Sequence, residues 1–221
     1  MKAGRWRFAD AREAGRALAS RLGAYTATDD LIVVGLASGG VPVAAEVARG
    51  LGAPLDVLLI RRLLVPRGLE SQVCAVNACG KLFVDEGLPP RSDAPETPLE
   101  HFISDALADF AERASACRGD RPALDLKGRT VLLVDNGIRT GLTLLAGVRA
   151  LRAAGAVRVV AAVPVAAPES RAVAEAACDA LVCLAWPEPF GHVGLWYGDF
   201  ARPDAAQIRE LLAESERVRL A

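Results

Sequence analysis

The most constraining feature of the sequence is the stretch from residue 131 to 143, which reads Val-Leu-Leu-Val-Asp-Asn-Gly-Ile-Arg-Thr-Gly-Leu-Thr. Its four consecutive apolar residues predict a strand buried on both faces, as in a parallel sheet. From Leu144 to Leu151 the apolar residues recur at helical spacing, so a helix should follow. The stretch therefore predicts a buried strand, an acidic tip, a glycine-bearing loop and a helix.

The loop between this strand and this helix is suited to binding an anion. Free backbone N–H groups and the positive end of the helix dipole would lie together at the carboxyl end of the strand. Thr140 and Thr143 add hydroxyl donors, and Gly141 lets the backbone approach an anion closely. Asp135, just before the loop, could accept hydrogen bonds from sugar hydroxyls. A sugar phosphate fits both halves; an ordinary turn between strand and helix is the alternative.

Residues 134–143 resemble the phosphoribosyl pyrophosphate (PRPP) motif of the type I phosphoribosyltransferases. That motif has four apolar residues, two acidic residues and a loop ending Thr-Gly-x-Thr. The resemblance implies an α/β fold with a parallel sheet covered by helices on both faces, and it places Asp135 and Asn136 at the catalytic positions. Asn136 stands where the family has its second acidic residue, and Arg139 and Leu142 stand where small residues are usual.

A second strand, glycine loop and helix occupy residues 31–51. Leu31 to Leu36 predicts a core strand, Ala37 to Gly40 a loop, and Val41 to Leu51 a helix with Pro42 in its first turn. The loop resembles the pyrophosphate-binding loop of the same family. A bacterial subgroup of uncharacterised phosphoribosyltransferases, which this chain resembles most, commonly reads Pro-Arg-Gly-Gly there. A tight turn without a ligand is the alternative interpretation.

The next strand, Leu55 to Ile60, ends in a pair of arginines, Arg61 and Arg62. The family has a basic pair at this point, and the resemblance implies contacts with pyrophosphate; a solvated strand end is the alternative. Residues 63–85 predict a hairpin and, by resemblance, a mobile loop that covers the site during reaction. Glu70 matches a carboxylate of the subgroup, with no role assigned.

The remaining pattern completes a parallel sheet. A long helix is expected over 99–117, strands over 157–165 and 180–184, a helix from Pro168, and a terminal helix after Pro203. This order of elements is typical of an α/β fold with helices on both faces of the sheet. Ligands bind in such folds at the carboxyl ends of the strands, where all of the loops described above would lie.

An aromatic-rich segment, here called the hood (about residues 185–203), follows the last strand. It is similar to the base-contacting region of purine phosphoribosyltransferases, where an aromatic ring stacks on the base and a nearby aspartate helps at pyrophosphate. By that similarity Phe190 or Trp196 would stack on an acceptor ring, and Asp199 would lie close to the metal or to pyrophosphate. The alternative is that the aromatics seal the sheet edge or a dimer contact, and we prefer this for Trp186 and Tyr197.

Composition limits the remaining classes of function. With 221 residues, 52% of them apolar, the chain should form one domain, 1–221, with a sizeable core. The net charge of −1 gives no reason to expect nucleic acid or an anionic membrane as partner. Residues 1–15 lack the apolar core of a signal peptide, so we expect a soluble, cytoplasmic protein. The five cysteines fit no standard zinc spacing and are expected to be reduced.

The resemblance implies a Mg²⁺-dependent phosphoribosyltransferase that moves ribose 5-phosphate from PRPP to a nitrogenous, nucleobase-like acceptor. Homodimers are common in that family. The alternative function is a PRPP- or nucleotide-binding regulatory protein that has lost turnover, and a third is a hydrolase of another sugar phosphate. The predicted site comprises the catalytic residues Asp135 and Asn136, the substrate-binding residues Gly137, Ile138, Arg139, Thr140, Gly141, Leu142, Thr143, Ser38, Gly39, Gly40, Arg61, Arg62 and Phe190, and the metal-binding residue Asp199.

Overall fold

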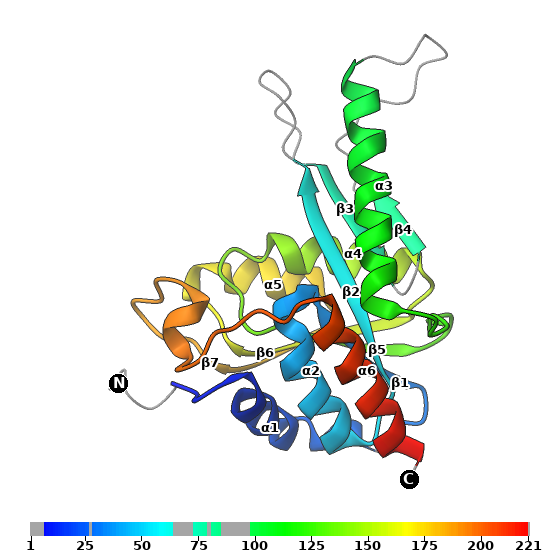
Figure 1. The fold of residues 1–221 in the computed structure, drawn as a ribbon. Helices are drawn as coiled ribbons and strands as arrows, with labels where there is room; N and C mark the ends of the chain where they lie inside the picture. The colour runs from blue at the N-terminus through cyan, green and yellow to red at the C-terminus, as the bar shows by residue number, and fades with distance from the viewer. Residues whose placement is uncertain (1–6, 27, 64–72, 79–80, 85–97, 221) are drawn as a thin grey trace.

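A seven-stranded sheet with the order β4-β3-β2-β1-β5-β6-β7 forms the centre of the computed structural model, which describes residues 7–26, 28–63, 73–78, 81–84 and 98–220 (Figure 1). Five strands pair in parallel: β1 (Leu31–Leu36), β2 (Leu55–Leu63), β5 (Thr130–Val134), β6 (Arg158–Val165) and β7 (Ala180–Ala185). An antiparallel hairpin, β3 (Val73–Ala78) and β4 (Lys81–Val84), extends the β2 edge. The predicted parallel sheet and hairpin are confirmed. Glu70 lies outside the described residues.

Helices cover both faces of the sheet (Figure 1). The helices on one face are α1 (Ala11–Arg21), α2 (Ala37–Leu51) and α6 (Ala205–Leu220), and those on the other are α4 (Leu142–Ala153) and α5 (Arg171–Ala177). A longer helix, α3 (Pro98–Arg118), packs on α6 and projects from the body beside β2. The short 3₁₀ helices of the described residues are η2 (Gly23–Tyr25), η3 (Pro168–Ser170) and η4 (Val193–Trp196). No helix in this part of the chain is long and apolar enough to cross a membrane.

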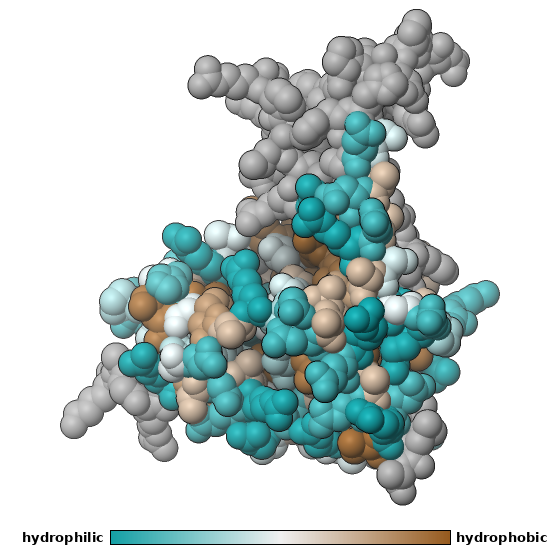
Figure 2. Space-filling model, viewed as in Figure 1, coloured by the Kyte–Doolittle hydropathy of each residue, from teal (hydrophilic) through white to brown (hydrophobic). Residues whose placement is uncertain are grey.

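The central strands are apolar on both sides because each side meets a helix layer. Along β1 and β5, alternate residues belong to opposite clusters: Val33 and Leu132 pack toward α1, α2 and α6, whereas Val34 and Leu133 pack toward α4. Successive side chains of a strand point to opposite faces, so burial of both faces requires a continuous apolar run. Most of the outer surface in the view of Figure 2 is hydrophilic, as expected once the apolar residues are enclosed.

The start of α2 differs from the sequence expectation. A loop was predicted over Ala37–Gly40, but α2 begins at Ala37, directly after β1, and Pro42 lies inside it, beyond its first turn. Ala37 has φ of 53°, a left-handed conformation that is rare for a residue with a Cβ. The left-handed backbone of Ala37 alone turns the chain from β1 into α2, so no loop separates the two elements. Asp10 caps the amino end of α1, since its carboxylate accepts the Glu13 N–H at 2.7 Å.

The strand order changes direction at β1, and this determines where a ligand can bind. The neighbours of β1 are β2 and β5. The helix that follows β1 covers one face of the sheet, and the helix that follows β5 covers the other. The two chain segments therefore diverge at the carboxyl ends of adjacent parallel strands and leave a crevice between them, which is the usual ligand site of such sheets.

A buried ion pair fixes α3 to the sheet. The Asp56 carboxylate of β2 is 1% exposed and pairs with the Arg118 guanidinium at the end of α3, at 2.6 Å. It also accepts the N–H groups of Val57 and Leu124, at 2.7 and 3.1 Å. One carboxylate thus holds a strand, a helix end and the connection that leads to β5.

Replacing Asp56 by alanine should lower the free energy of unfolding by about 3–5 kcal/mol, because Arg118 would remain buried without a counter-charge. Urea denaturation measures the loss. The control is Glu175→Ala, which removes the exposed partner of Arg171 and should cost at most about 0.5 kcal/mol. Equal decreases in the free energy of unfolding of the two variants would show that the buried ion pair stabilises the protein no more than an exposed one does.

Candidate functional site

A cavity of about 420 Å³ opens at the crevice between β1 and β5. Three segments form its walls: the turn from β1 into α2, the loop from β5 into α4, and the hood. The residues that line it are Ala37, Ser38, Gly39, Ile60, Asp135, Asn136, Arg139, Thr143, His192, Val193, Gly194, Phe200 and Arg202. Segments far apart in the sequence thus meet at one hollow.

The first wall is the amino-terminal turn of α2, which presses against the end of β5. A Cβ placed on Gly39 would lie 2.5 Å from Asn136 Nδ2, and one on Gly40 would lie 2.6 Å from the Val134 carbonyl oxygen. Only glycine permits this approach. Within the described residues, no side chain caps this end of α2, so its first N–H groups remain available to a ligand beside the Ser38 hydroxyl.

The second wall is the loop from Asp135 to Thr143. Ile138 fixes the loop to the core: its N–H donates to the Val165 carbonyl at 3.0 Å, and its carbonyl accepts the Ala167 N–H at 2.8 Å. Gly141 has φ of 81° and directs the chain into α4. No side chain of the described residues caps α4 either. A second set of free helix N–H groups therefore lies beside the Thr143 hydroxyl.

Asp135 lies between these two helix ends. Its Oδ1 accepts the N–H of Asn136 at 2.7 Å. Burial raises the pKa of the Asp135 carboxyl from its ordinary value to about 7, an effect partly opposed by the Asn136 N–H and by the positive charge of Arg202. Burial therefore favours the protonated form of this carboxyl more than in an exposed aspartate.

Two arginines contribute positive charge to the lining. Arg139 from the loop and Arg202 from the hood are exposed to the cavity, and neither forms an ion pair within the described part of the chain. Apart from Asp135, the lining residues that the structure describes include no acidic side chain. The charge distribution favours an anionic ligand.

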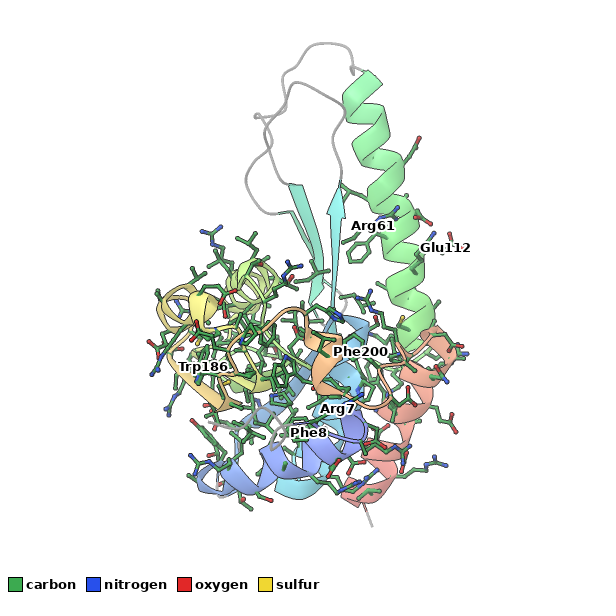
Figure 3. The ribbon with its side chains drawn as sticks, turned by 90° about the vertical axis from the view of Figure 1, so that its left-hand side faces the viewer. Arg7, Phe8, Arg61, Glu112, Trp186 and Phe200 are labelled. Atoms are coloured by element: carbon green, nitrogen blue, oxygen red, sulfur yellow. The ribbon has the colours of Figure 1, made fainter. Side chains whose placement is uncertain are left out.

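The third wall, the hood, is fastened to the amino-terminal segment. Phe8 forms an isolated parallel bridge with Tyr197, and Figure 3 shows Phe8 below the hood residue Phe200. The Tyr197 hydroxyl donates to the Asn136 carbonyl oxygen at 2.5 Å. Tyr197 is 2% exposed, so it packs inside the protein, in line with the interpretation preferred for it from the sequence.

Of the predicted residues, the structure gathers six around the cavity: Ser38, Gly39, Asp135, Asn136, Arg139 and Thr143. Four other predicted residues are buried and shape the first turn of α2 and the loop before α4. They are Gly40, Gly137, Ile138 and Gly141. Thr140 and Leu142 are exposed beside the cavity and do not line it.

Three other predicted residues lie elsewhere. Phe190 is buried, and its ring stacks on Trp196 with centroids 6.1 Å apart, so it does not face the cavity. Asp199 lines a different hollow of about 370 Å³. Arg61 forms an ion pair with Asp109 of α3, and Figure 3 shows Arg61 beside this helix. Arg61 and the cavity-lining Ile60 are adjacent on β2 and point to opposite faces, so Arg61 does not line the cavity.

The ion pair of Arg61 extends to a second arginine of α3. Asp109 also accepts Arg113 Nε at 3.0 Å, and hydrogen bonds from the two arginines lower the pKa of the Asp109 carboxyl. The backbone of Arg62 lies opposite that of Cys74 in the register of β2 with β3. The side chain of Arg62 is outside the described part of the structure.

Sequence reasoning missed most of the hood wall. It identified the aromatic segment but not His192, Phe200 or Arg202 as lining residues. Phe200 and Arg202 line the cavity, whereas Asp199 and Ala201 line the other hollow. Residues 199–202 lie outside any helix or strand, and Asp199 accepts the Ala201 N–H at 3.1 Å, so no regular period in the sequence indicated this division.

The oxygen donors of the cavity suit a magnesium ion only in part. Among the described residues no three His, Cys, Asp or Glu side chains are grouped as a metal site. The Asp135 carboxylate and the Asn136 amide are the side-chain oxygens at the centre of the lining. Mg²⁺ keeps several waters and often takes its other ligands from substrate phosphates. The residues therefore fit a Mg²⁺ ion that arrives with a phosphate ligand.

Comparison with known proteins identifies relatives of the chain. A family model described as "Phosphoribosyl transferase domain" matches residues 9–195. Two Mycobacterium tuberculosis proteins, Rv0571c and MT0597, whose names assign them provisionally to the phosphoribosyl transferases, are each 36% identical over 210 residues. The match covers 95% of this chain and 47% of theirs, so the chain spans less than half of their length. The solved structure of TT1426 from Thermus thermophilus has a TM-score of 0.77 and 35% identity, over 94% of this chain and 98% of that one.

Replacing Asp135 by asparagine should stabilise the protein increasingly as the pH rises. The folded state holds the Asp135 proton up to about pH 7, whereas the unfolded chain releases it near pH 4, so wild-type stability falls between these values. The variant lacks this loss and should gain on the order of 2–4 kcal/mol over the wild type at pH 8, and little at pH 4.

Urea midpoints of both proteins between pH 4 and 8 measure this difference. Asp105→Asn, on the exposed surface of α3, serves as the control and should show no such trend. A pH-independent difference between Asp135→Asn and the wild type would contradict the raised pKa.

Proposed function

The chain belongs to the phosphoribosyl transferase family, and we propose on that premise that it transfers ribose 5-phosphate from PRPP to a nitrogenous, nucleobase-like acceptor. One observation carries the proposal: the uncapped amino ends of α2 and α4 open into the same cavity, with Asp135 between them. PRPP has a phosphate at one end of its ribose and a diphosphate at the other. It needs two anion sites separated by a group that binds sugar hydroxyls.

The 5-phosphate is assigned to the α4 end. The free N–H groups there and the Thr143 hydroxyl can donate hydrogen bonds to phosphate oxygens, and the helix dipole favours the negative charge. Arg139 supplies a full positive charge from the same loop. The family usually has a small, uncharged residue at the position of Arg139, so this loop carries an additional positive charge.

The diphosphate is assigned to the α2 end. Ser38 and the backbone N–H groups of the first turn supply donors, and Gly39 lets the Asn136 amide lie against this turn. Asp135 and Asn136 are the residues that would hold a Mg²⁺ ion here, and the ion would neutralise charge on the leaving diphosphate. The strained Ala37 is consistent with a backbone held in advance for this contact.

Asp135 is assigned to the ribose hydroxyls. Hydroxyl donors favour the ionised carboxylate, so ligand binding should draw its pKa down from about 7. As the bond between ribose and diphosphate breaks, positive charge develops on the sugar, and a nearby carboxylate stabilises it. Asn136 contributes an amide where the family has a second carboxylate, so it can bind a hydroxyl without adding charge.

The hood wall is assigned to the acceptor because the two phosphate sites use the other walls. Phe200 offers an aromatic face, and the backbone of residues 192–194 offers polar groups to a planar ring. A Cβ on Gly194 would lie 2.9 Å from Phe200 and 3.3 Å from the His192 ring, so these three residues form one continuous surface. A hood above the sugar would also exclude water from its reactive cation.

Calorimetric titration with PRPP in the presence of Mg²⁺ tests the proposal. We expect saturable binding in the micromolar range, about −8 kcal/mol. Arg139→Met should weaken the affinity about tenfold, since it removes a charge-assisted contact to the 5-phosphate. The control is Arg158→Met, at the amino end of β6 and therefore at the opposite edge of the sheet, which should bind as the wild type does. Absence of binding to wild-type protein would overturn the proposal.

A PRPP- or nucleotide-binding regulator is the second candidate, and Asn136 is the observation that favours it. Asn136→Asp should raise the rate of ribosyl transfer about tenfold or more if the protein is an attenuated enzyme, because a second carboxylate would stabilise the sugar cation. The new carboxylate would lie beside Gly39 at the positive end of α2. Radiolabelled PRPP with a panel of nucleobases measures the rate. Unchanged, undetectable turnover despite PRPP binding would favour the regulator.

A further inference from the structure

Tyr197 is a hood residue whose hydroxyl forms a hydrogen bond with the loop from Asp135 to Thr143. Its side chain is buried, with its ring between those of Phe8 and Phe200 at centroid distances of 5.9 and 5.3 Å. The hydroxyl emerges from this aromatic packing and donates to the Asn136 carbonyl oxygen at 2.5 Å. Tyr197 does not line the cavity, so any effect on a ligand must pass through its neighbours.

Asn136 is the junction through which that effect would pass. Its N–H donates to Asp135 Oδ1 at 2.7 Å, and its carbonyl accepts the Tyr197 hydroxyl. Its side-chain amide lies over Gly39, at 2.5 Å from the position a Cβ would take there. A shift of the Asn136 backbone would therefore disturb the carboxylate of the ribose site and the turn of the diphosphate site together.

The hydroxyl of Tyr197 is held by a frame that does not depend on the loop it contacts. Three backbone hydrogen bonds join the hood to residues 8 and 9: Phe8 N–H to the Trp196 carbonyl at 2.9 Å, Gly198 N–H to the Phe8 carbonyl at 2.8 Å, and Asp199 N–H to the Ala9 carbonyl at 2.8 Å. The next residue, Asp10, caps α1. Tyr197 is thus anchored through residues 8–10 to α1, which covers the face of the sheet opposite to α4.

We propose that Tyr197 is a positioning residue, which holds the Asn136 peptide so that the ribose and diphosphate sites keep the spacing that PRPP requires. The inference rests on the proposed function. Burial, together with the negative charge of Asp135, raises the pKa of the Tyr197 hydroxyl, so it remains a hydrogen-bond donor across the physiological range. The same contact joins the hood wall, including Phe200, to the sugar end of the cavity.

Replacement of Tyr197 by phenylalanine removes one hydroxyl and keeps the aromatic packing. PRPP affinity in Mg²⁺, measured by calorimetry on protein shown to be folded, should fall five- to thirtyfold. The chain has only one other tyrosine, Tyr25 in η2, which lines neither the cavity nor the hood, and Tyr25→Phe is therefore the matched control. Its affinity should equal that of the wild type.

A double-mutant cycle separates positioning from stability. A purely structural role would lower the urea midpoint of Tyr197→Phe but leave the affinity of the folded protein unchanged. Positioning through Asn136 predicts coupling: the change in PRPP affinity caused by Asn136→Asp should differ at least threefold between the wild-type background and the Tyr197→Phe background. Additive effects would overturn the mechanism proposed for the contact.

Fluorine NMR tests the contact while the tyrosine hydroxyl is retained. Protein labelled with 3-fluorotyrosine should give two signals, one from each tyrosine, and PRPP with Mg²⁺ should shift the signal of Tyr197 and not that of Tyr25. If wild-type protein binds PRPP but Tyr197→Phe binds it equally well, the positioning role fails and the proposed function stands. If wild-type protein binds neither PRPP nor ribose 5-phosphate, the proposed function fails and the inference with it.

Discussion

The structure depends on the convergence of two helix amino ends at the carboxyl edge of adjacent parallel strands. Because β1 and β5 are neighbours, and their helices cover opposite faces of the sheet, α2 and α4 both begin beside one hollow. Each helix start leaves N–H groups that no side chain of the described residues satisfies. An anion that accepts these hydrogen bonds recovers free energy that the unliganded protein forgoes, typically about 1 kcal/mol for each missing cap.

The unliganded site holds several unfavourable features together. Ala37 has a left-handed backbone, Asp135 is desolvated, and Arg139 and Arg202 lack ionic partners among the described residues. In the complex proposed above, phosphates would pair with the two arginines and ribose hydroxyls with the Asp135 carboxylate, which would relieve these two unfavourable features. The surrounding sheet is apolar on both faces and rigid enough to retain such strain. The stable core and the less stable site are thus parts of one arrangement.

The sequence was sufficient for the elements whose pattern is local. Apolar runs located the five parallel strands, and helical spacing of apolar residues located the helix that follows β5, because these signals depend on neighbouring residues. It placed the start of α2 four residues late, since a left-handed alanine has no signal in its residue type. It could not tell that Phe190 would be buried against Trp196 while Phe200 faced the cavity. That choice depends on how the hood folds back onto residues 8 and 9, a contact between distant parts of the chain.

The alternation of residues 199–202 between two hollows has a consequence for the divergence of related proteins. Phe200 and Arg202 border the cavity, whereas Asp199 and Ala201 border the second hollow between α1, the hood and α6. Substitutions at positions 200 and 202 can alter the chemistry offered to an acceptor without touching the helix ends assigned to the phosphates. If the hood binds the acceptor as proposed, substitutions at positions 200 and 202 would let evolution or design change the acceptor preference while the helix ends that bind the phosphates stay the same.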